Sequence, residues 1–205
     1  MSIQSIVDGA QAISKDRRTN IDVTRTLGGI VKYSRSGPYL TTFSITPSYP
    51  TPAQHDALVA QLGQHLLGPY NISFTDFTVR TNGEFFNHTH SATVFGGFQS
   101  GTILAIDGLQ PSVTNVFAAG DTIQVVGVPF TYIVLNNVSS NALGQVTVTL
   151  DQPLAAVPAD NAAINVGRDI LWSVFVEEIP AELGSARLPF NVSYGGQFIL
   201  REGNT

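Results

Sequence analysis

Residues 101–166 consist of short apolar runs that each end at Gly, Asn, Asp or Pro, and this pattern constrains the fold more than any other feature. The runs are rich in Val, Ile and Thr, which favour strands, and they are too short for stable helices. They occupy residues 102–108, 122–129, 130–135, 145–150 and 162–166. Short strands that recur at this spacing predict a small barrel or sandwich. We therefore expect residues 101–166 to form a small β-barrel module.

Strand-like segments also lie on both sides of this module. They occupy residues 21–25, 30–35, 39–46, 70–80, 84–95, 171–178 and 198–200, with turns expected at Gly28-Gly29 and Ser36-Gly37-Pro38. We expect the last two segments to rejoin the sheet that the first segments form. Residues 21–100 and 167–205 then make up one β-sandwich domain, and the barrel module is inserted into it after a Gly-rich hinge at residues 95–101.

One amphipathic helix is well marked between residues 51 and 68. The Thr-Pro-Ala-Gln sequence at 51–54 supplies an N-cap, a proline for the first turn and a capping-box glutamine. Leu58, Leu62 and Leu66 then form one apolar stripe, and a Gly-Pro pair ends the pattern. Such a stripe must be buried against the sheet or against a neighbouring subunit.

The N-terminal segment shows a weaker pattern. Apolar residues between 3 and 14 recur at roughly helical spacing, which predicts a short helix, and the charged residues 15–18 suggest a polar connector. We therefore expect residues 1–20 to form a separate N-terminal arm.

Charge is scarce and unevenly distributed. Charged residues make up 12% of the chain and hydrophobic residues 43%, which indicates much neutral surface suited to contacts with other subunits. The net charge is −5, and no Lys or Arg occurs between Arg80 and Arg168. A protein that grips a nucleic acid needs clustered cations. We therefore expect no sequence-specific nucleic-acid binding.

Cysteine and long apolar segments are both absent from the sequence. The lack of Cys excludes disulfides, thiolate zinc sites, iron–sulfur clusters and cysteine nucleophiles. No run of about 18 apolar residues is present that could span a bilayer, and the N-terminus lacks the pattern of a signal peptide. We expect a protein that stays in soluble form, without membrane insertion.

A series of motifs carries a resemblance to a known family. The series runs from Gly37-Pro38 through the Thr-Pro-Ala-Gln helix start and the Gly-Gly-Phe-Gln-Ser-Gly run at 96–101. It continues with Ala-Gly-Asp-Thr-Ile-Gln-Val-Val-Gly at 119–127, Gly-Gln-Val-Thr-Val at 144–148 and an apolar terminal strand. Across residues 21–200 this order resembles the distal-tail and baseplate-type structural proteins of long-tailed bacteriophages.

The resemblance implies a fold, an assembly and a location. It implies a mainly β protein, with a tail-tube-like β-sandwich, one amphipathic helix and the inserted small barrel. Such proteins form a homo-oligomeric ring around the DNA channel and dock other tail or baseplate proteins, such as tube, hub and fibre-adaptor proteins. The expected location is the virion tail, after synthesis in the host cytoplasm. No catalytic residues belong to the pattern.

His88 and His90 are the candidates for a metal site. On a strand, residues two positions apart face the same way, so both imidazoles can reach one metal ion. The alternative is a pair of polar residues that face solvent or a subunit boundary, and no third ligand follows nearby. Because no third ligand accompanies the two histidines, we predict no metal and no cofactor.

The sequence offers even weaker candidates for a catalytic site than for a metal site. Glu177 and Glu178 are adjacent on an expected strand and point to opposite faces, so they cannot act together on one bond, and Asp121 is more simply a structural or solvated carboxylate. The sequence holds no nucleophile elbow, phosphate loop or dinucleotide fingerprint. His55 and His65 lie on the expected helix and suit surface or interface roles. We predict that the chain is not an enzyme.

Two further groups of residues bear on partners. The basic cluster Arg17, Arg18, Arg25, Lys32 and Arg35 suits contact with an acidic neighbour, such as the acidic half of an adjacent copy, or is a solvated face. Trp172 and the 12 Phe residues suit core and interface positions. The leading interpretation is a ring-forming tail or baseplate subunit. Its alternatives are a receptor- or glycan-binding module of a virion fibre and, less favoured, a tail-associated cell-wall hydrolase.

Overall fold

The computed structural model describes residues 3–25, 31–47, 72–75, 81–178 and 197–203, together with residues 53, 56–58, 60 and 63. As expected, the protein is mainly β, and its strands form three antiparallel sheets. The chain divides into two compact units. Unit 1 contains residues 1–73 and 173–203, and unit 2 contains residues 74–172 between them.

The boundaries of these units differ from those expected. Unit 2 begins at residue 74 and ends at residue 172, so it is larger than the expected module of residues 101–166. The Gly-rich run at 95–101, expected as a hinge, lies inside unit 2. Residues 1–20, expected as a separate arm, belong to unit 1. The residues of a turn show that the chain reverses there, but they do not show to which unit the strands on either side belong.

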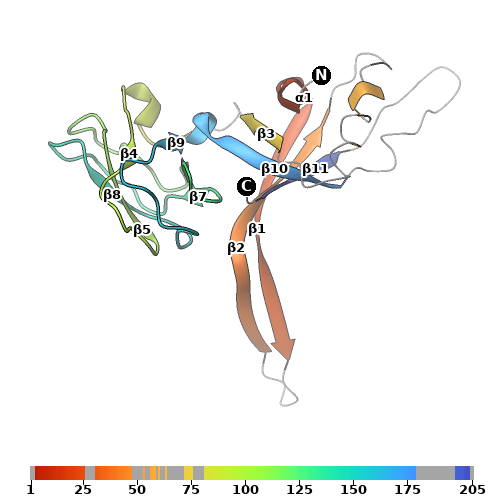
Figure 1. Cartoon of the computed structure of the whole chain (residues 1–205), viewed down its shortest axis with the longest axis horizontal. Coiled ribbons are helices and arrows are strands. Elements are labelled where there is room, and N and C mark those ends of the chain that lie inside the picture. Colours follow the sequence, from red (N-terminus) through yellow and green to blue (C-terminus); the bar gives the residue numbers. More distant parts are fainter. Residues whose placement is uncertain are drawn as a thin grey trace, which may run out of the picture. The chain divides into compact units, whose positions relative to one another are not determined.

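Unit 1 is built on a five-stranded sheet with the order β1-β2-β11-β10-β3 (Figure 1). The prediction that the last two strands rejoin the first ones is confirmed. The elements are α1 (Ile3–Asp8), β1 (Ala12–Arg25), β2 (Val31–Thr46), β3 (Ile72–Thr75), β10 (Leu171–Glu178) and β11 (Phe198–Glu202).

The N-terminal elements differ from the expectation. The helix expected over residues 3–14 ends at Asp8, and the charged residues 15–18, expected as a connector, lie within β1. Charged side chains suit this strand because it is at an edge of the sheet, where they discourage uncontrolled pairing.

Alternating burial explains why the central strands pair in this register. Phe43 of β2 lies opposite Leu200 of β11, and Ile45 lies opposite Phe198; none of the four side chains is exposed. Side chains two positions apart share a face, so these residues line one buried side of the sheet. Leu58, on the expected helix, is also buried, and the described residues between 53 and 63 are helical.

The turn expected at residues 36–38 is not a turn, because β2 continues through it. Arg18 pairs with Leu40 and Asn20 pairs with Ser36, so one residue of β1 opposes three of β2. Gly37 has a φ of 87°, and Pro38 has no N–H to donate. These properties, which also favour turns, here form a β-bulge. The turn expected at Gly28-Gly29 lies outside the described residues.

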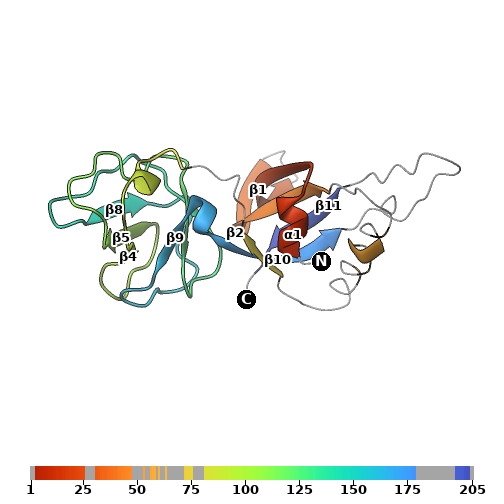
Figure 2. The ribbon, with the colours of Figure 1, turned by 90° about the horizontal axis from the view of Figure 1, so that it is seen from above.

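Unit 2 contains two three-stranded sheets, in the orders β4-β5-β8 and β7-β6-β9 (Figure 2). The strands are short, as the sequence predicts, but they do not close into a barrel in the described part of the chain. The elements are η1 (Phe85–Asn87), β4 (Thr93–Val94), β5 (Ile103–Asp107), β6 (Thr122–Val125), β7 (Tyr132–Ile133), β8 (Val146–Thr149), β9 (Ile164–Val166) and η2 (Gly167–Asp169). The strand expected over residues 84–95 is therefore reduced to β4, preceded by a 3-10 turn.

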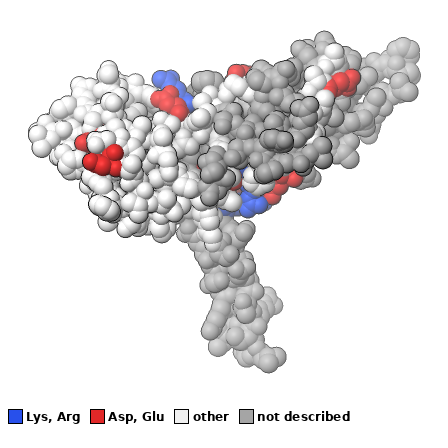
Figure 3. Space-filling model, in the orientation of Figure 1, with Lys and Arg blue, Asp and Glu red and all other residues white. Residues whose placement is uncertain are grey.

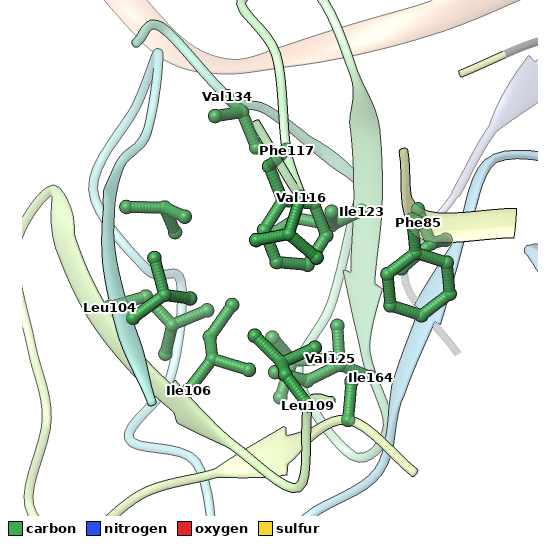
Figure 4. Packing of buried hydrophobic residues seen from close by; sticks show 14 of the residues in the cluster. Phe85, Leu104, Ile106, Leu109, Val116, Phe117, Ile123, Val125, Val134 and Ile164 are labelled. Carbon is green, nitrogen blue, oxygen red and sulfur yellow. The ribbon is translucent and has the colours of Figure 1, made fainter. Parts of the chain in front are cut away.

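The two sheets of unit 2 enclose one apolar core. Leu104 and Ile106 of β5 lie across this core from Ile123 of β6 (Figure 4). All three side chains are fully buried. Isolated bridges join the sheets at their margins, among them Thr93 with Ala163. The core therefore holds together strands that are individually too short to be stable.

Two glycines allow the connections of unit 2 to cross closely. Gly108 has a φ of 71°, and a Cβ atom there would lie 2.1 Å from the carbonyl oxygen of Ser91. Gly144 has a φ of 74°, and a Cβ atom there would lie 2.1 Å from the carbonyl oxygen of Leu109. Both positions require Gly for its backbone conformation and for its lack of a side chain.

We expect Gly108→Ala to lower the unfolding free energy of unit 2 by about 3 kcal/mol, because strain and a backbone clash add. Gly127→Ala is the matched control: its φ is 83°, but open space surrounds the added methyl group. The control should cost only about 1 to 2 kcal/mol. Urea unfolding followed by the fluorescence of Trp172, the single tryptophan, measures both. Equal losses for the two variants would contradict the clash.

Candidate interaction surfaces

Strands β1 and β2 form a long two-stranded ribbon, here called the β1–β2 ribbon (residues 12–25 and 31–46). The two strands pair from Ala12 opposite Thr46 to Arg25 opposite Val31. β11 pairs with β2 only at Thr42–Ile45. Beyond that point the ribbon runs past the other strands of its sheet (Figure 1). Among the described strands, residues 31–41 of β2 have no partner other than β1.

A buried carboxylate lies at the point where the pairing of β11 with β2 ends. Arg201 pairs with Thr42, and the next N–H along β2, that of Thr41, donates to the Glu202 carboxylate over 3.0 Å. Glu202 is 3% exposed. Its side chain therefore takes the place of a further backbone partner. In the sequence, Glu202 follows the apolar strand segment 198–200 and Arg201. This position is the only sign that its carboxylate accepts a backbone N–H group.

The basic cluster predicted from the sequence is assembled on this ribbon. Six of the ten Lys and Arg residues lie between residues 15 and 35, against two Asp. Arg18 is exposed and pairs with Asp16, and the Arg17 guanidinium lies 5.8 Å from the centre of the Tyr39 ring. The strand positions of Arg25, Lys32 and Arg35 are described, but their side chains lie outside the described part. The ribbon is thus the most basic part of the chain.

Unit 2 has the opposite charge balance. Residues 81–172 contain six Asp or Glu and one cation, Arg168, whose guanidinium lies 4.4 Å from the centre of the Phe86 ring. Several of the carboxylates accept backbone N–H groups: Asp151 from Ile133 and Asp160 from Gly96, each at 2.9 Å. Most of the surface of unit 2 in Figure 3 is uncharged. The few charges therefore hold loops in place, and the surface left between them is largely neutral.

Asp121, one of the residues considered for acid–base chemistry, has a structural role. It is fully buried and accepts N–H groups from Asn82 at 2.5 Å, Gly83 at 3.2 Å and Ala118 at 2.9 Å. No room exists for a side chain at residue 83, where a Cβ atom would lie 2.7 Å from the carbonyl oxygen of Val116. This carboxylate joins the start of unit 2 to the turn before β6.

Of the other residues considered for catalysis or for surface roles, the structure describes the side chain of Glu177. Glu177 is exposed at the end of β10 and accepts a hydrogen bond from Arg201 at 3.1 Å. The side chain of Glu178 and the whole of His55 and His65 lie outside the described residues. Asp121 and Glu177 belong to different units.

His88 and His90 lie close together, but not on a strand. They follow η1, and their ring centres are 5.9 Å apart. Nδ1 of His90 accepts the backbone N–H of Gln110 at 2.9 Å, and its ring packs at 4.6 Å from that of Phe85. Nε2 of His90 is buried without a hydrogen-bond partner. Nδ1 of His90 is thus occupied by a backbone N–H, and the described residues hold no cluster of three side chains that could ligate a metal ion.

Trp172 and the aromatic residues of the 130s lie mostly inside the molecule. Trp172 is 3% exposed and Tyr132 is fully buried. The Tyr132 hydroxyl donates to the carbonyl oxygen of Pro129 and accepts the N–H of Ala155, each at 2.9 Å. Phe130 is half-buried. Trp172 is therefore buried, in agreement with the expected core or interface position, and neither Trp172 nor Tyr132 presents a ring on which a sugar could stack.

Comparisons with known proteins add no identification. No protein-family model matches the chain, and no curated protein matches it by sequence. None of the helices in the described part of the chain has the length and apolar character needed to cross a membrane.

We expect Asp121→Ala to lower the unfolding free energy of unit 2 by about 3 kcal/mol, because three backbone N–H groups lose a charged acceptor. The exposed Asp169, changed to Ala, is the control and should have an effect near zero. Chemical unfolding followed by Trp172 fluorescence measures both. An Asp121→Ala variant as stable as the control would show that the carboxylate is dispensable.

His90 should make the stability of unit 2 depend on pH. Burial lowers the pKa of His90 below its ordinary value of 6.5, and the neighbouring His88 lowers it further. The unfolded chain therefore binds the proton more readily. The contribution of His90 to stability is complete above pH 6.5 and is lost as the pH falls through the lowered pKa.

Unfolding measured at a series of pH values from 7.5 to 5 tests this expectation. His90→Gln should flatten the decrease at low pH, whereas His88→Ala should keep most of it, because burial is the larger cause of the shift. A decrease that persists unchanged in the His90→Gln variant would assign the effect to other groups.

Proposed function

We propose that this chain is a structural subunit of a bacteriophage tail or baseplate, which forms a ring with copies of itself around the DNA channel and docks other tail proteins. The observation that carries the proposal is the β1–β2 ribbon. A two-stranded ribbon with both outer edges open is marginally stable alone in water. Open edges also invite pairing with other chains. A ribbon of this length gains its stability when another subunit covers it.

The distribution of charge supports the same proposal. Neutral surface, as on unit 2, costs little to remove from water when subunits pack together. A basic ribbon and an acidic, nearly cation-free unit 2 on one chain are complementary between copies. A contact between different surfaces of identical chains generates rings when its rotation closes. The motif resemblance to distal-tail and baseplate proteins gives this assembly its biological setting.

The alternative function is a receptor- or glycan-binding module of a virion fibre. Trp172 and Tyr132 are buried, so neither ring supports this alternative by offering a surface for a sugar. The lack of a catalytic grouping among the described residues gives no support to a hydrolase. We therefore favour a structural role, in which the chain acts by binding neighbouring proteins.

Negative-stain electron microscopy and mass photometry of the purified chain test the proposal. We expect rings with a central hole wide enough for a DNA duplex. A second chain, in which a two-residue Asn-Gly turn replaces residues 21–35, keeps the pair Asn20 and Ser36 at the end of a short hairpin. This variant should fold but form no rings, because the part of the ribbon that another subunit covers has been removed. Uniform trimers without a channel, or rings from the shortened chain, would contradict the proposal.

A further inference from the structure

The loop at residues 95–101, here called the Phe98 loop, is held rigidly by one side chain. The Gln99 amide donates to the carbonyl oxygens of Phe95, Gly96 and Ala105 at 2.8, 3.1 and 3.2 Å. Its oxygen accepts the N–H of Ala105 at 2.6 Å. The N–H of Gly96 is held by Asp160. The loop is therefore fixed before any partner arrives, which lowers the entropy lost on binding.

This fixed loop presents a phenylalanine to solvent in a strained conformation. The side chain of Phe98 is 94% exposed, and its φ is 63°. A left-handed backbone costs a non-glycine residue about 1 to 2 kcal/mol. No burial of Phe98 within its own unit offsets this cost. An exposed aromatic held in a strained conformation therefore indicates a contact made outside the unit.

The surroundings of Phe98 are apolar and acidic. Phe95 is 48% exposed, and Val157 is 57% exposed. Val157 belongs to residues 154–160, a segment that is hydrogen-bonded to the loop at both of its ends, from Leu154 to Gly101 and from Gly96 to Asp160. The carboxylate of Asp160 is bound to this loop through the N–H of Gly96, and no Lys or Arg occurs in residues 81–167. The matching partner surface is a shallow apolar site bordered by cations.

We infer that the Phe98 loop of one copy docks on the β1–β2 ribbon of a second copy. The ribbon carries most of the cations of the chain, and its described part combines exposed Lys15 and Arg18 with the half-buried apolar residues Ile13, Tyr39 and Leu40. An aromatic side chain on a rigid loop is the common form of an interface anchor. This inference rests on the proposed self-assembly and specifies the two surfaces that meet.

Sedimentation velocity over a range of concentrations measures the self-association of the full chain and its variants. Phe98→Ala should weaken self-association by about tenfold or more, the usual effect of truncating an anchor residue. Leu143→Ala is the matched control, because Leu143 is 77% exposed on another turn of unit 2 and should have little effect. The double variant Lys15→Glu/Arg18→Glu should weaken association similarly. Unchanged Trp172 fluorescence verifies that each variant is folded.

Photochemical cross-linking identifies the surface that residue 98 contacts. With benzoylphenylalanine in place of Phe98, irradiation should give a species of twice the chain mass, cross-linked to a peptide from residues 12–46. Cross-links to another region, or assembly that is unaffected by Phe98→Ala, overturn this inference and leave the proposed ring function standing. A chain that shows no self-association at any concentration overturns both.

Discussion

In the described part of this protein, polar side chains accept many of the backbone N–H groups that lack a strand partner, and at two buried places the acceptor is a carboxylate. Glu202 accepts the N–H of Thr41 where β11 ends, and Asp121 accepts three N–H groups at the start of unit 2. An unsatisfied buried N–H costs about as much as a lost hydrogen bond. Short strands with many ends generate many such groups. The fold therefore depends on polar side chains at these ends, among them its few carboxylates.

This use of charge has a consequence for the surface. Carboxylates that hold loops and strand ends leave the faces between them neutral, and the cations are concentrated on the β1–β2 ribbon. The result is a chain with a basic extension, an acidic and largely uncharged unit, and a rigid loop that exposes Phe98. These features are costly for an isolated monomer and favourable for a subunit that is covered by its neighbours.

Local patterns in the sequence predicted the strands well, and their errors have physical reasons. The short runs of unit 2 became strands because alternating apolar residues can be buried only in that form. Gly37-Pro38 was interpreted as a turn, yet the same backbone properties serve a bulge when a long partner strand continues past it. His88 and His90 were placed on a strand, but Phe85 and Gln110 draw His90 into a packed loop.

The sequence by itself determined the β class, the positions of most strands, the scarcity of charge and the absence of cysteine chemistry. These properties depend on composition and on neighbours within a few residues. Tertiary structure alone decided the unit boundaries, the length of the β1–β2 ribbon and the roles of Glu202, Asp121 and Gln99. Glu202 and Thr41 are 161 residues apart in the chain. Their bond exists only because the sheet brings β2 and β11 together, and no local pattern encodes that pairing.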